Sequence, residues 1–367
     1  MQLNPHAGMP GEGVAKPIHG RGASTNPMNR FEVLRLERDE EWNPDEDLPP
    51  GMMLFRDASS TIINYNDSPD IGFETSVNPY RGCEHGCIYC FARPSHEYLG
   101  FSAGLDFETR IMVKEDAPEL LRNELSSRKW KPQVIVMSGV TDCYQPIERK
   151  LKITRRCLEV LAEFRNPVAI ITKNALITRD IDVLASLARD NAVAVNVSVT
   201  TLDPTLTPKL EPRAPLPRAR LGAIEALSRN DVPVGVLVAP VIPALTDHEM
   251  PSIIAAAVQA GAKWAGYVPL RLPFGIKGLF ETWLDQHFPE RKEKILDRIR
   301  ALRGGKLNDP RFGTRMRGEG IFAEQLESLF ALSCRKAGLA GVRPELSTAS
   351  FRVPSSGLPC MQKMFPF

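Results

Sequence analysis

Three closely spaced cysteines are the residues of this chain whose types and spacing best suit chemistry. Cys83, Cys87 and Cys90 are separated by three and then two residues, on a loop that contains glycine. A closed zinc site normally has four protein ligands, and four cysteines usually complete a simple cubane. Three thiolates therefore predict a 4Fe–4S cluster with one iron left open to a substrate or a second cofactor.

A zinc site is the alternative for the same loop, with His85 or His96 as the fourth ligand. In that case the chain would be a zinc-stabilised, non-catalytic nucleic-acid-binding protein. A third alternative is an iron–sulfur protein that only carries electrons. Metal content and colour would distinguish a zinc protein from an iron–sulfur protein. Release of a reaction product would distinguish an enzyme from an electron carrier.

A second group of candidate residues follows the apolar run 133–139. Ser138, Gly139 and Asp142 offer polar groups and a close approach to the backbone, so they are candidate cofactor-binding residues. The alternative for Asp142 is a helix cap. Cys143 has a weak S–H bond and is a candidate hydrogen-atom donor, although most isolated cysteines are inert packing residues.

Single polar residues close to other apolar runs form a third group. Lys173 ends one run, Ser198 lies on the next, and Arg220 closes the Pro-rich segment 211–220. A bound carboxylate needs a cation, which Lys or Arg supplies through charge-assisted hydrogen bonds. A sugar hydroxyl needs a short polar partner such as Ser198. Each of these residues could instead be a cap or a solvated side chain.

Arg311, Arg315 and Arg317 lie in a basic, glycine-rich loop that also contains Phe312. Such a loop can bind a phosphate backbone, so nucleic acid is a candidate partner. A solvated charged surface is the alternative.

Six short β-branched runs, alternating with helical patterns, must position these residues. This alternation predicts parallel β/α units, with catalytic groups at the C-terminal ends of the strands. Six units are too few for an eight-fold barrel, so we expect an α/β fold with a partial (β/α)6 TIM-like barrel or an open doubly wound sheet. The expected strands are Phe73–Asn78, Gln133–Gly139, Val168–Thr172, Ala192–Thr201, Val232–Ile242 and Trp264–Leu272. The expected helices between them are Ala117–Arg128, Ile153–Phe164, Asp180–Arg189, Pro217–Ser228 and Asp247–Ala260.

Composition shifts divide the chain into four parts. The first part of the chain is rich in Pro, Gly and charged residues, which predicts a mobile or strap-like arm. The third part has helical patterns, which predict a helical C-terminal extension. The extension is expected to contain helices Leu279–His287, Glu293–Leu302 and Ile321–Lys336. The four parts are the arm (1–58), the core domain (59–275), the extension (276–345) and a tail (346–367).

Composition excludes several classes of protein. The chain has 367 residues, 43% hydrophobic and 25% charged, with a formal net charge of +2, so no global field indicates a nucleic-acid or membrane partner. Seven cysteines, three of them crowded together, are typical of a metal site in a reducing compartment and not of a disulfide framework. We see no signal peptide and no apolar run of about 18 residues, and we expect a cytoplasmic protein without membrane contact.

The loop from Asn78 to Arg93 resembles the signature of the radical S-adenosylmethionine (SAM) superfamily, Cys-x-x-x-Cys-x-x-Cys. Residues 60 to 340 resemble the proteins related to spore photoproduct lyase, often described as DNA-repair-photolyase-like, and most of all an uncharacterised bacterial subgroup. The resemblance implies a partial (β/α)6 barrel, a 4Fe–4S cluster on the three cysteines and SAM on the open iron. The most specific segments are 66–73, 78–93, 141–148, 211–215 and 312–320.

The resemblance also implies an activity. The enzyme would reductively cleave SAM to a 5′-deoxyadenosyl radical and abstract hydrogen from a substrate, with nucleic acid as a candidate. An external one-electron reductant of the flavodoxin or ferredoxin type would be needed. Tyr89 would lie near the adenine, and the loop after Gln133–Gly139 near the SAM amino group. In the lyase a donor cysteine lies near Gly139 in register, whereas here Cys143 comes a few residues later, so repair of a thymine photoproduct does not follow.

Overall fold

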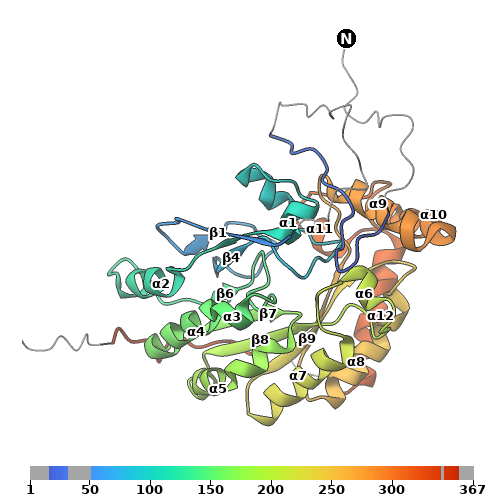
Figure 1. Ribbon diagram of the computed structural model, residues 1–367. Helices are drawn as coiled ribbons and strands as arrows, with labels where there is room; N and C mark the ends of the chain where they lie inside the picture. Colours follow the sequence, from blue (N-terminus) through green and yellow to red (C-terminus); the bar gives the residue numbers. More distant parts are fainter. Residues whose placement is uncertain (1–15, 32–50, 340–342, 355–367) are drawn as a thin grey trace, which may run out of the picture.

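The computed structural model describes residues 16–31, 51–339 and 343–354, and a mostly parallel β-sheet is its central element (Figure 1). Six strands run parallel in chain order, and a seventh, β2 (Ile63–Tyr65), is antiparallel at one edge. Every strand predicted from the sequence is present, which confirms the partial (β/α)6 barrel. The parallel strands are β3 (Thr75–Val77), β6 (Ile135–Met137), β7 (Val168–Thr172), β8 (Val193–Ser198), β9 (Val234–Val241) and β10 (Ala265–Pro269).

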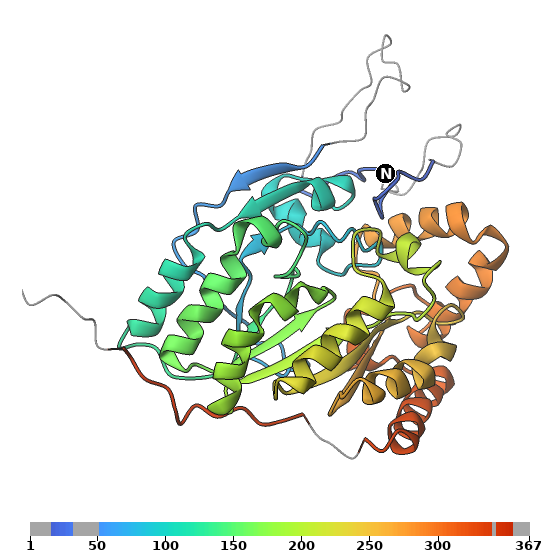
Figure 2. The same ribbon diagram turned by 60° about the horizontal axis from the view of Figure 1, so that its bottom comes forward.

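Helices between the strands cover the outer side of this sheet (Figure 2). The strands need this cover because β7 and β8 are buried along almost their whole length. In α4, Leu158, Leu161 and Phe164 recur at helical spacing and face the core. The covering helices are α2 (Ala117–Ser126), α4 (Ile153–Phe164), α5 (Ile181–Arg189), α7 (Pro217–Arg229) and α8 (Met250–Gln259), whereas the short α3 (Glu148–Leu151) and α6 (Thr207–Leu210) belong to the loops that follow β6 and β8.

The C-terminal helices form two groups. Helix α12 (Ile321–Lys336) packs on α8, whereas α9 (Ile276–His287) and α10 (Lys292–Leu302) build a second hydrophobic core that includes Cys87 of the cysteine loop. The short α11 (Thr314–Arg317) contacts β10. The extension thus packs on both the barrel and the cysteine loop.

A small second sheet was not predicted from the sequence. Strand β1 (Met53–Arg56) pairs in parallel with β5 (Arg110–Val113), and β4 (Tyr80–Arg81) pairs antiparallel with the same strand. The 3-10 helix η2 (Arg93–Leu99) and helix α1 (Leu105–Thr109) precede β5. Part of the expected arm is therefore a strand of the folded protein.

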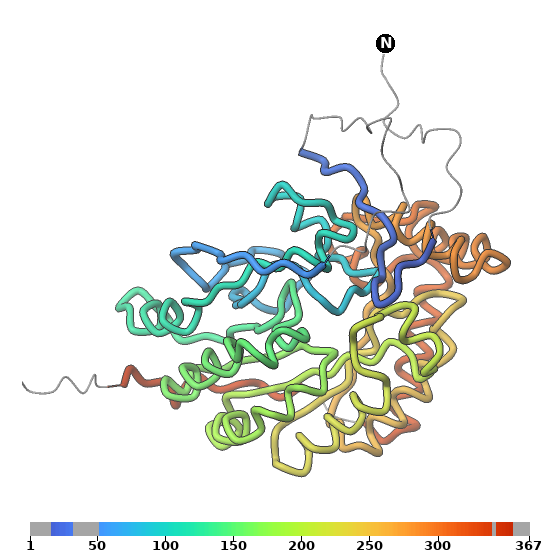
Figure 3. The backbone as a smooth tube through the Cα atoms, viewed as in Figure 1, coloured from blue at the N-terminus to red at the C-terminus, as the bar shows by residue number. Residues whose placement is uncertain are grey.

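Residues 16–31, called the strap below, lie across the cysteine loop (Figure 3). The Asn29 amide, for example, donates to the carbonyl oxygens of Glu97 and Phe101. In the tail, the backbone N–H of Ser347 donates to the carbonyl of Asn191. The rest of the expected arm (1–15 and 32–50) and of the tail (355–367) lies outside the described residues. No helix in the described ranges combines the length and apolar character needed to span a bilayer.

Candidate active site

A cavity of about 290 Å³ opens at the C-terminal ends of the parallel strands. Because the carboxyl ends of parallel strands meet at one edge of a sheet, residues far apart in sequence converge there. The cavity brings together most of the predicted site residues. Those that line it are Cys83, Cys87, Tyr89, Cys90, Ser138, Gly139, Asp142, Lys173 and Ser198.

The cysteine loop is held by its own backbone. Gly86 has a positive φ of 66°, and a Cβ there would lie 2.8 Å from the Glu108 carboxylate, so the loop requires glycine at this point. The N–H of Cys83 donates to the carbonyl of Phe107 at 2.9 Å, and that of Cys90 to the carbonyl of Cys87 at 3.2 Å. These bonds turn the three thiols toward one cavity.

Burial and nearby cations have opposite effects on the pKa values of Cys87 and Cys90. Burial is the largest cause that raises the pKa of each thiol, and it brings that of Cys87 to about 12. Nearby cations act in the opposite direction: Lys173 lowers the pKa of Cys87 and Cys90, and Arg93 lowers that of Cys90. Three buried sulfurs that face one space would ionise on binding iron, so the donor set fits a cluster held by three thiolates.

Neither histidine of the zinc alternative completes a zinc site with the cysteines. Among the described residues, no three or more His, Cys, Asp or Glu side chains are grouped to hold a single metal ion, and this includes the three cysteines. His96 packs between Phe101 and Phe107 away from the cavity, and burial lowers its pKa to about 4. His85 lines the cavity, but its Nε2 lies 3.0 Å from the amide of Asn174.

A buried ion pair fastens the cysteine loop to the strap. Arg93 donates to the carbonyl oxygens of Gly86 and Cys87 and forms an ion pair with Glu108. The same carboxylate accepts the backbone N–H groups of Gly22 (3.1 Å) and Ala23 (2.8 Å). Loop, helix α1 and strap are thus joined through one carboxylate.

The loop after β6 is tied to the end of β7 by Asp142. One carboxylate oxygen accepts the hydroxyl of Thr172 and the other the backbone N–H of Lys173, each at 2.8 Å. Ser138 has a positive φ of 73°, and its Oγ accepts the backbone N–H of Cys143 at 2.7 Å. Asp142 therefore joins two strand ends, and it faces the cavity at the same time.

Lys173 and Tyr89 lie together on one wall of the cavity. The Lys173 Nζ lies 5.8 Å from the centroid of the Tyr89 ring. The Tyr89 hydroxyl is anchored behind the wall by hydrogen bonds with Thr200 and Glu211. Both residues line the cavity, and the position of the Tyr89 ring is fixed by its hydroxyl.

Arg220 is not placed as expected. Its side chain is 1% exposed, and it forms an ion pair with Glu211 and donates to the carbonyl oxygens of Ser198 and Pro215. It does not line the cavity. Arg220, predicted to contact a ligand carboxylate, thus lies behind the cavity and supports Tyr89 through Glu211, whereas Lys173 is one of the cations that line the cavity.

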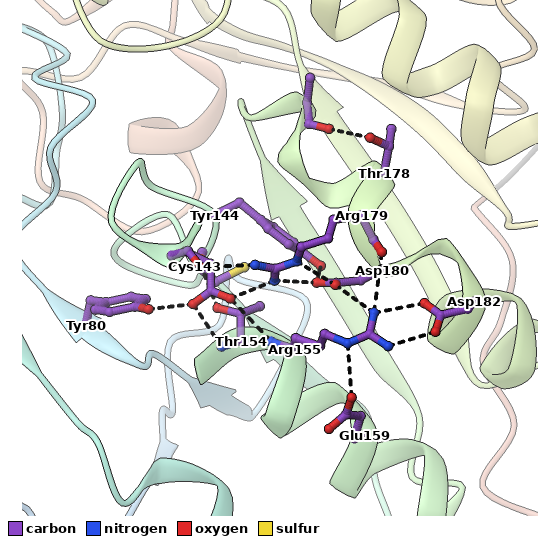
Figure 4. Close-up of polar contacts among 12 residues, drawn as sticks. Tyr80, Cys143, Tyr144, Thr154, Arg155, Glu159, Thr178, Arg179, Asp180 and Asp182 are labelled. Carbon is purple, nitrogen blue, oxygen red and sulfur yellow. Dashed lines mark hydrogen bonds and ion pairs between the residues drawn. The ribbon is translucent and has the colours of Figure 1, made fainter. Parts of the chain in front are cut away.

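Cys143 also lies outside the cavity. It is fully buried in the main hydrophobic core, and its carbonyl accepts the Thr154 hydroxyl at 2.6 Å (Figure 4). Burial is the main cause that raises the pKa of its thiol well above the ordinary value. The structure therefore places Cys143 in the core, as the packing alternative expects, and the hydrogen-donor role remains a prediction.

A buried charged network lies next to Cys143 (Figure 4). Tyr80 donates its hydroxyl to Glu148, and Arg179 forms ion pairs with both Glu148 and Asp180. Arg155 forms an ion pair with Asp180 from the opposite side. The network fixes the loop between β6 and α4, so the cavity residues on that loop rest on a rigid support.

Most of the basic loop is neutralised within the protein. Arg311 pairs with Asp309 and Glu319, and Arg315 pairs with Asp70 at 2.5 Å. The Arg315–Asp70 contact joins α11, next to β10, to the segment between β2 and β3, so it connects the two ends of the open sheet. Arg317 is exposed.

Arg271 and Met316 are among the cavity residues that sequence reasoning missed. Arg271 follows β10, and Met316 comes from α11. Arg271 is a cation near the C-terminal end of an apolar run, as Lys173 is, so the same signal could have identified it. Met316 carries no signal in the sequence, because only the fold brings α11 to the cavity.

Comparison with known proteins assigns the chain to a family. The model of the Radical SAM superfamily matches residues 77–257. An uncharacterised protein of Mycobacterium tuberculosis is 36% identical over 263 residues, which cover 71% of this chain and 76% of the relative. An uncharacterised protein of Methanocaldococcus jannaschii is 28% identical over 224 residues, covering 61% and 80%. The chain belongs to the radical SAM superfamily and is an enzyme with radical chemistry.

Solved structures then specify the fold. A Y98F mutant of spore photoproduct lyase has a TM-score of 0.58 at 15% sequence identity, covering 80% of this chain and 82% of the lyase. The lyase complexed with dinucleoside spore photoproduct has a TM-score of 0.54 at 15% identity, covering 77% and 78%. This chain has the spore photoproduct lyase fold.

Proposed function

We propose that Cys83, Cys87 and Cys90 hold a 4Fe–4S cluster and that SAM binds beside it in the cavity. The observation that carries this proposal is the convergence of three buried thiols with Lys173 on one cavity at the strand ends. With both groups bound, reductive cleavage of SAM supplies a 5′-deoxyadenosyl radical that abstracts a hydrogen atom from the substrate.

The side chains of the cavity have separable tasks in this proposal. Lys173 binds the SAM carboxylate through a charge-assisted contact, and Ser198 contacts a ribose hydroxyl. Tyr89 offers its ring to the adenine, and Ser138, Gly139 and Asp142 surround the amino group. Apolar residues on the remaining wall, such as Leu237 and Val268, exclude water from the reactive centre.

Anaerobic reconstitution with iron and sulfide tests the proposal. We expect about four iron atoms per chain, a brown colour, and release of 5′-deoxyadenosine when SAM and a reductant of the flavodoxin type are added. Cys87→Ser should abolish both, whereas Cys334→Ser, a half-buried cysteine of α12, should change neither. A colourless zinc protein would reject the proposal, and so would a coloured protein that never cleaves SAM.

For the substrate, we propose nucleic acid. The fold neighbour was solved with dinucleoside spore photoproduct, and two exposed rings of this chain suit base stacking: Phe91 on the cavity wall and Phe312 next to α11. Arg317 is the exposed arginine available for a backbone phosphate. Photo-cross-linking of the anaerobic, cluster-loaded protein to single-stranded DNA and RNA tests this. Cross-links should map to Phe91 and Phe312 and weaken in Arg317→Gln, and an absence of cross-links would argue for a different substrate.

A further inference from the structure

Arg271 places a cation in the cavity wall without a carboxylate of its own. No ion pair within 4.0 Å joins it to a described residue, and its Nε is buried without a hydrogen-bond partner in the described part of the chain. Its Nη1 donates to the Sδ of Met316 at 3.2 Å, and a thioether is a weak acceptor. Its guanidinium carbon lies 5.6 Å from the centroid of the Phe91 ring. Burying a charge without a partner is unfavourable, so this arrangement is suited to receive an anion.

The surroundings of Arg271 do not neutralise it. Burial lowers its pKa, the nearby Arg315 lowers it further, and Asp70 acts in the opposite direction. Both carboxylate oxygens of Asp70, however, already accept hydrogen bonds from Arg315. The nearest acidic group is therefore committed to another arginine.

The backbone directly before Arg271 and directly before Met316 is fixed by one arginine. Arg303 is 2% exposed, and its guanidinium donates to the carbonyl oxygens of Pro269 and Leu270, directly before Arg271. The same guanidinium donates to the carbonyl oxygens of Thr314 and Arg315, directly before Met316. One buried arginine thus joins the two backbone segments that carry Arg271 and Met316, which is the support a preorganised binding position needs.

Two cationic side chains, Lys173 and Arg271, line the cavity. SAM has one carboxylate, and Lys173, next to Tyr89 of the cysteine loop, is placed to bind it. Arg271 lies beside Phe91, whose ring is 49% exposed at the cavity wall. We infer that Arg271 and Phe91 form a substrate subsite, in which the guanidinium binds a phosphate or carboxylate and the ring contacts an adjacent planar group. This inference rests on the proposed function only in giving Lys173 to SAM.

Equilibrium binding of small aromatic anions tests the subsite. The probes are phenyl phosphate and benzoate, added separately to the full-length, cluster-loaded protein with saturating SAM and followed by ligand-observed NMR. Hydrogen bonds to charged groups are stronger than neutral ones, so Arg271→Gln should lower the affinity for the preferred probe about tenfold or more. Arg271→Lys should have an intermediate effect, because it keeps the charge but loses the planar fork. Tighter binding of phenyl phosphate than benzoate would identify the group as a phosphate, and the reverse order as a carboxylate.

Arg298→Gln is the matched control. Arg298 also lies over a phenylalanine ring, with its guanidinium carbon 4.0 Å from the Phe322 centroid, but it does not line the cavity. Its replacement should leave the affinity for either probe unchanged. Benzyl alcohol, which has the ring without the anion, should bind wild type and Arg271→Gln equally.

Two results would overturn the inference. One is equal affinity of wild type and Arg271→Gln for both probes, including the case in which neither probe binds. The other is a loss of SAM affinity in Arg271→Gln that equals the loss in Lys173→Gln, with probe binding unaffected. If the Arg271→Gln protein does not load its cluster, Arg271→Lys is compared with wild type instead. Failure of the proposed function would appear separately, as a wild-type protein that releases no 5′-deoxyadenosine.

Discussion

Arg93 and Glu108 form an ion pair in which the Nη2–Oε1 distance is 2.5 Å and both side chains are fully buried. The arginine holds carbonyl oxygens of the cysteine loop, and the glutamate holds backbone N–H groups of the strap. A pair of this kind stabilises little by itself, but removing one partner leaves an uncompensated charge. The geometry of the cysteine loop therefore depends on two residues that do not touch the cavity.

Glu108→Gln should destabilise the protein and reduce the iron it retains. It leaves the buried Arg93 without its counter-charge, which costs about 3 kcal/mol or more. Urea unfolding and iron analysis after anaerobic reconstitution measure the two effects. Glu163→Gln is the control, because its pair with Arg122 is exposed and worth less than about 1 kcal/mol. An equal effect of both substitutions would contradict the role assigned to the buried pair.

Gly22→Ala should release the strap from the cysteine loop. A Cβ at Gly22 would lie 1.7 Å from the carbonyl oxygen of Gly86, so the strap must move. We expect faster amide exchange at positions 22 and 23 and faster proteolysis in the strap. Gly222→Ala provides the comparison, since that position on α7 has no neighbour within 4 Å and helix propensity favours alanine there. Unchanged exchange in Gly22→Ala would show that the strap does not depend on this close approach.

Glu211 should make stability depend on acid pH. Burial alone would raise its pKa, but Arg220, Lys173 and the Tyr89 hydroxyl outweigh burial and lower it to about 2. A carboxyl with a lowered folded-state pKa contributes stability that is present above about pH 4.5 and is lost as the pH falls toward 2. Wild type should therefore lose on the order of 2–3 kcal/mol more than Glu211→Gln between pH 5 and 2. Urea unfolding across this range measures the difference, and parallel curves would contradict the assignment.

Cys143→Ala should retain SAM cleavage. The thiol lies in the core and not at the cavity, so the substitution should lower the free energy of unfolding by about 1 kcal/mol without stopping 5′-deoxyadenosine release. Quantification of 5′-deoxyadenosine, with Cys87→Ser as the inactive reference, checks this. Loss of product in a well-folded, cluster-loaded Cys143→Ala protein would contradict the packing position assigned to this thiol.

The sequence predicted the strands of the barrel well because each is an apolar run between helical patterns. It did not predict β1, since Met53–Arg56 follows a polar segment and pairs only with the distant β5. Arg220 was misplaced for a related reason: a cation near a strand end looks free in sequence until its partner Glu211 is seen beside it. The local sequence pattern identifies helices and strands, whereas the pairing of buried charges depends on tertiary contacts.

The same limit applied to the cavity. The cysteine spacing identified the proposed cluster loop, and residues at strand ends such as Lys173 and Ser198 were found because parallel strands converge. Met316 reaches the cavity only because α11 lies against β10. The packing of the C-terminal extension had to be known before that wall could be assigned.

The contact between the strap and Glu108 has a consequence for how the protein is made. Residues 16–31 leave the ribosome well before Glu108 and Arg93, so they can dock only after the cysteine loop and α1 have been synthesised. The cysteine loop therefore gains its support from the strap only after the loop itself has been made.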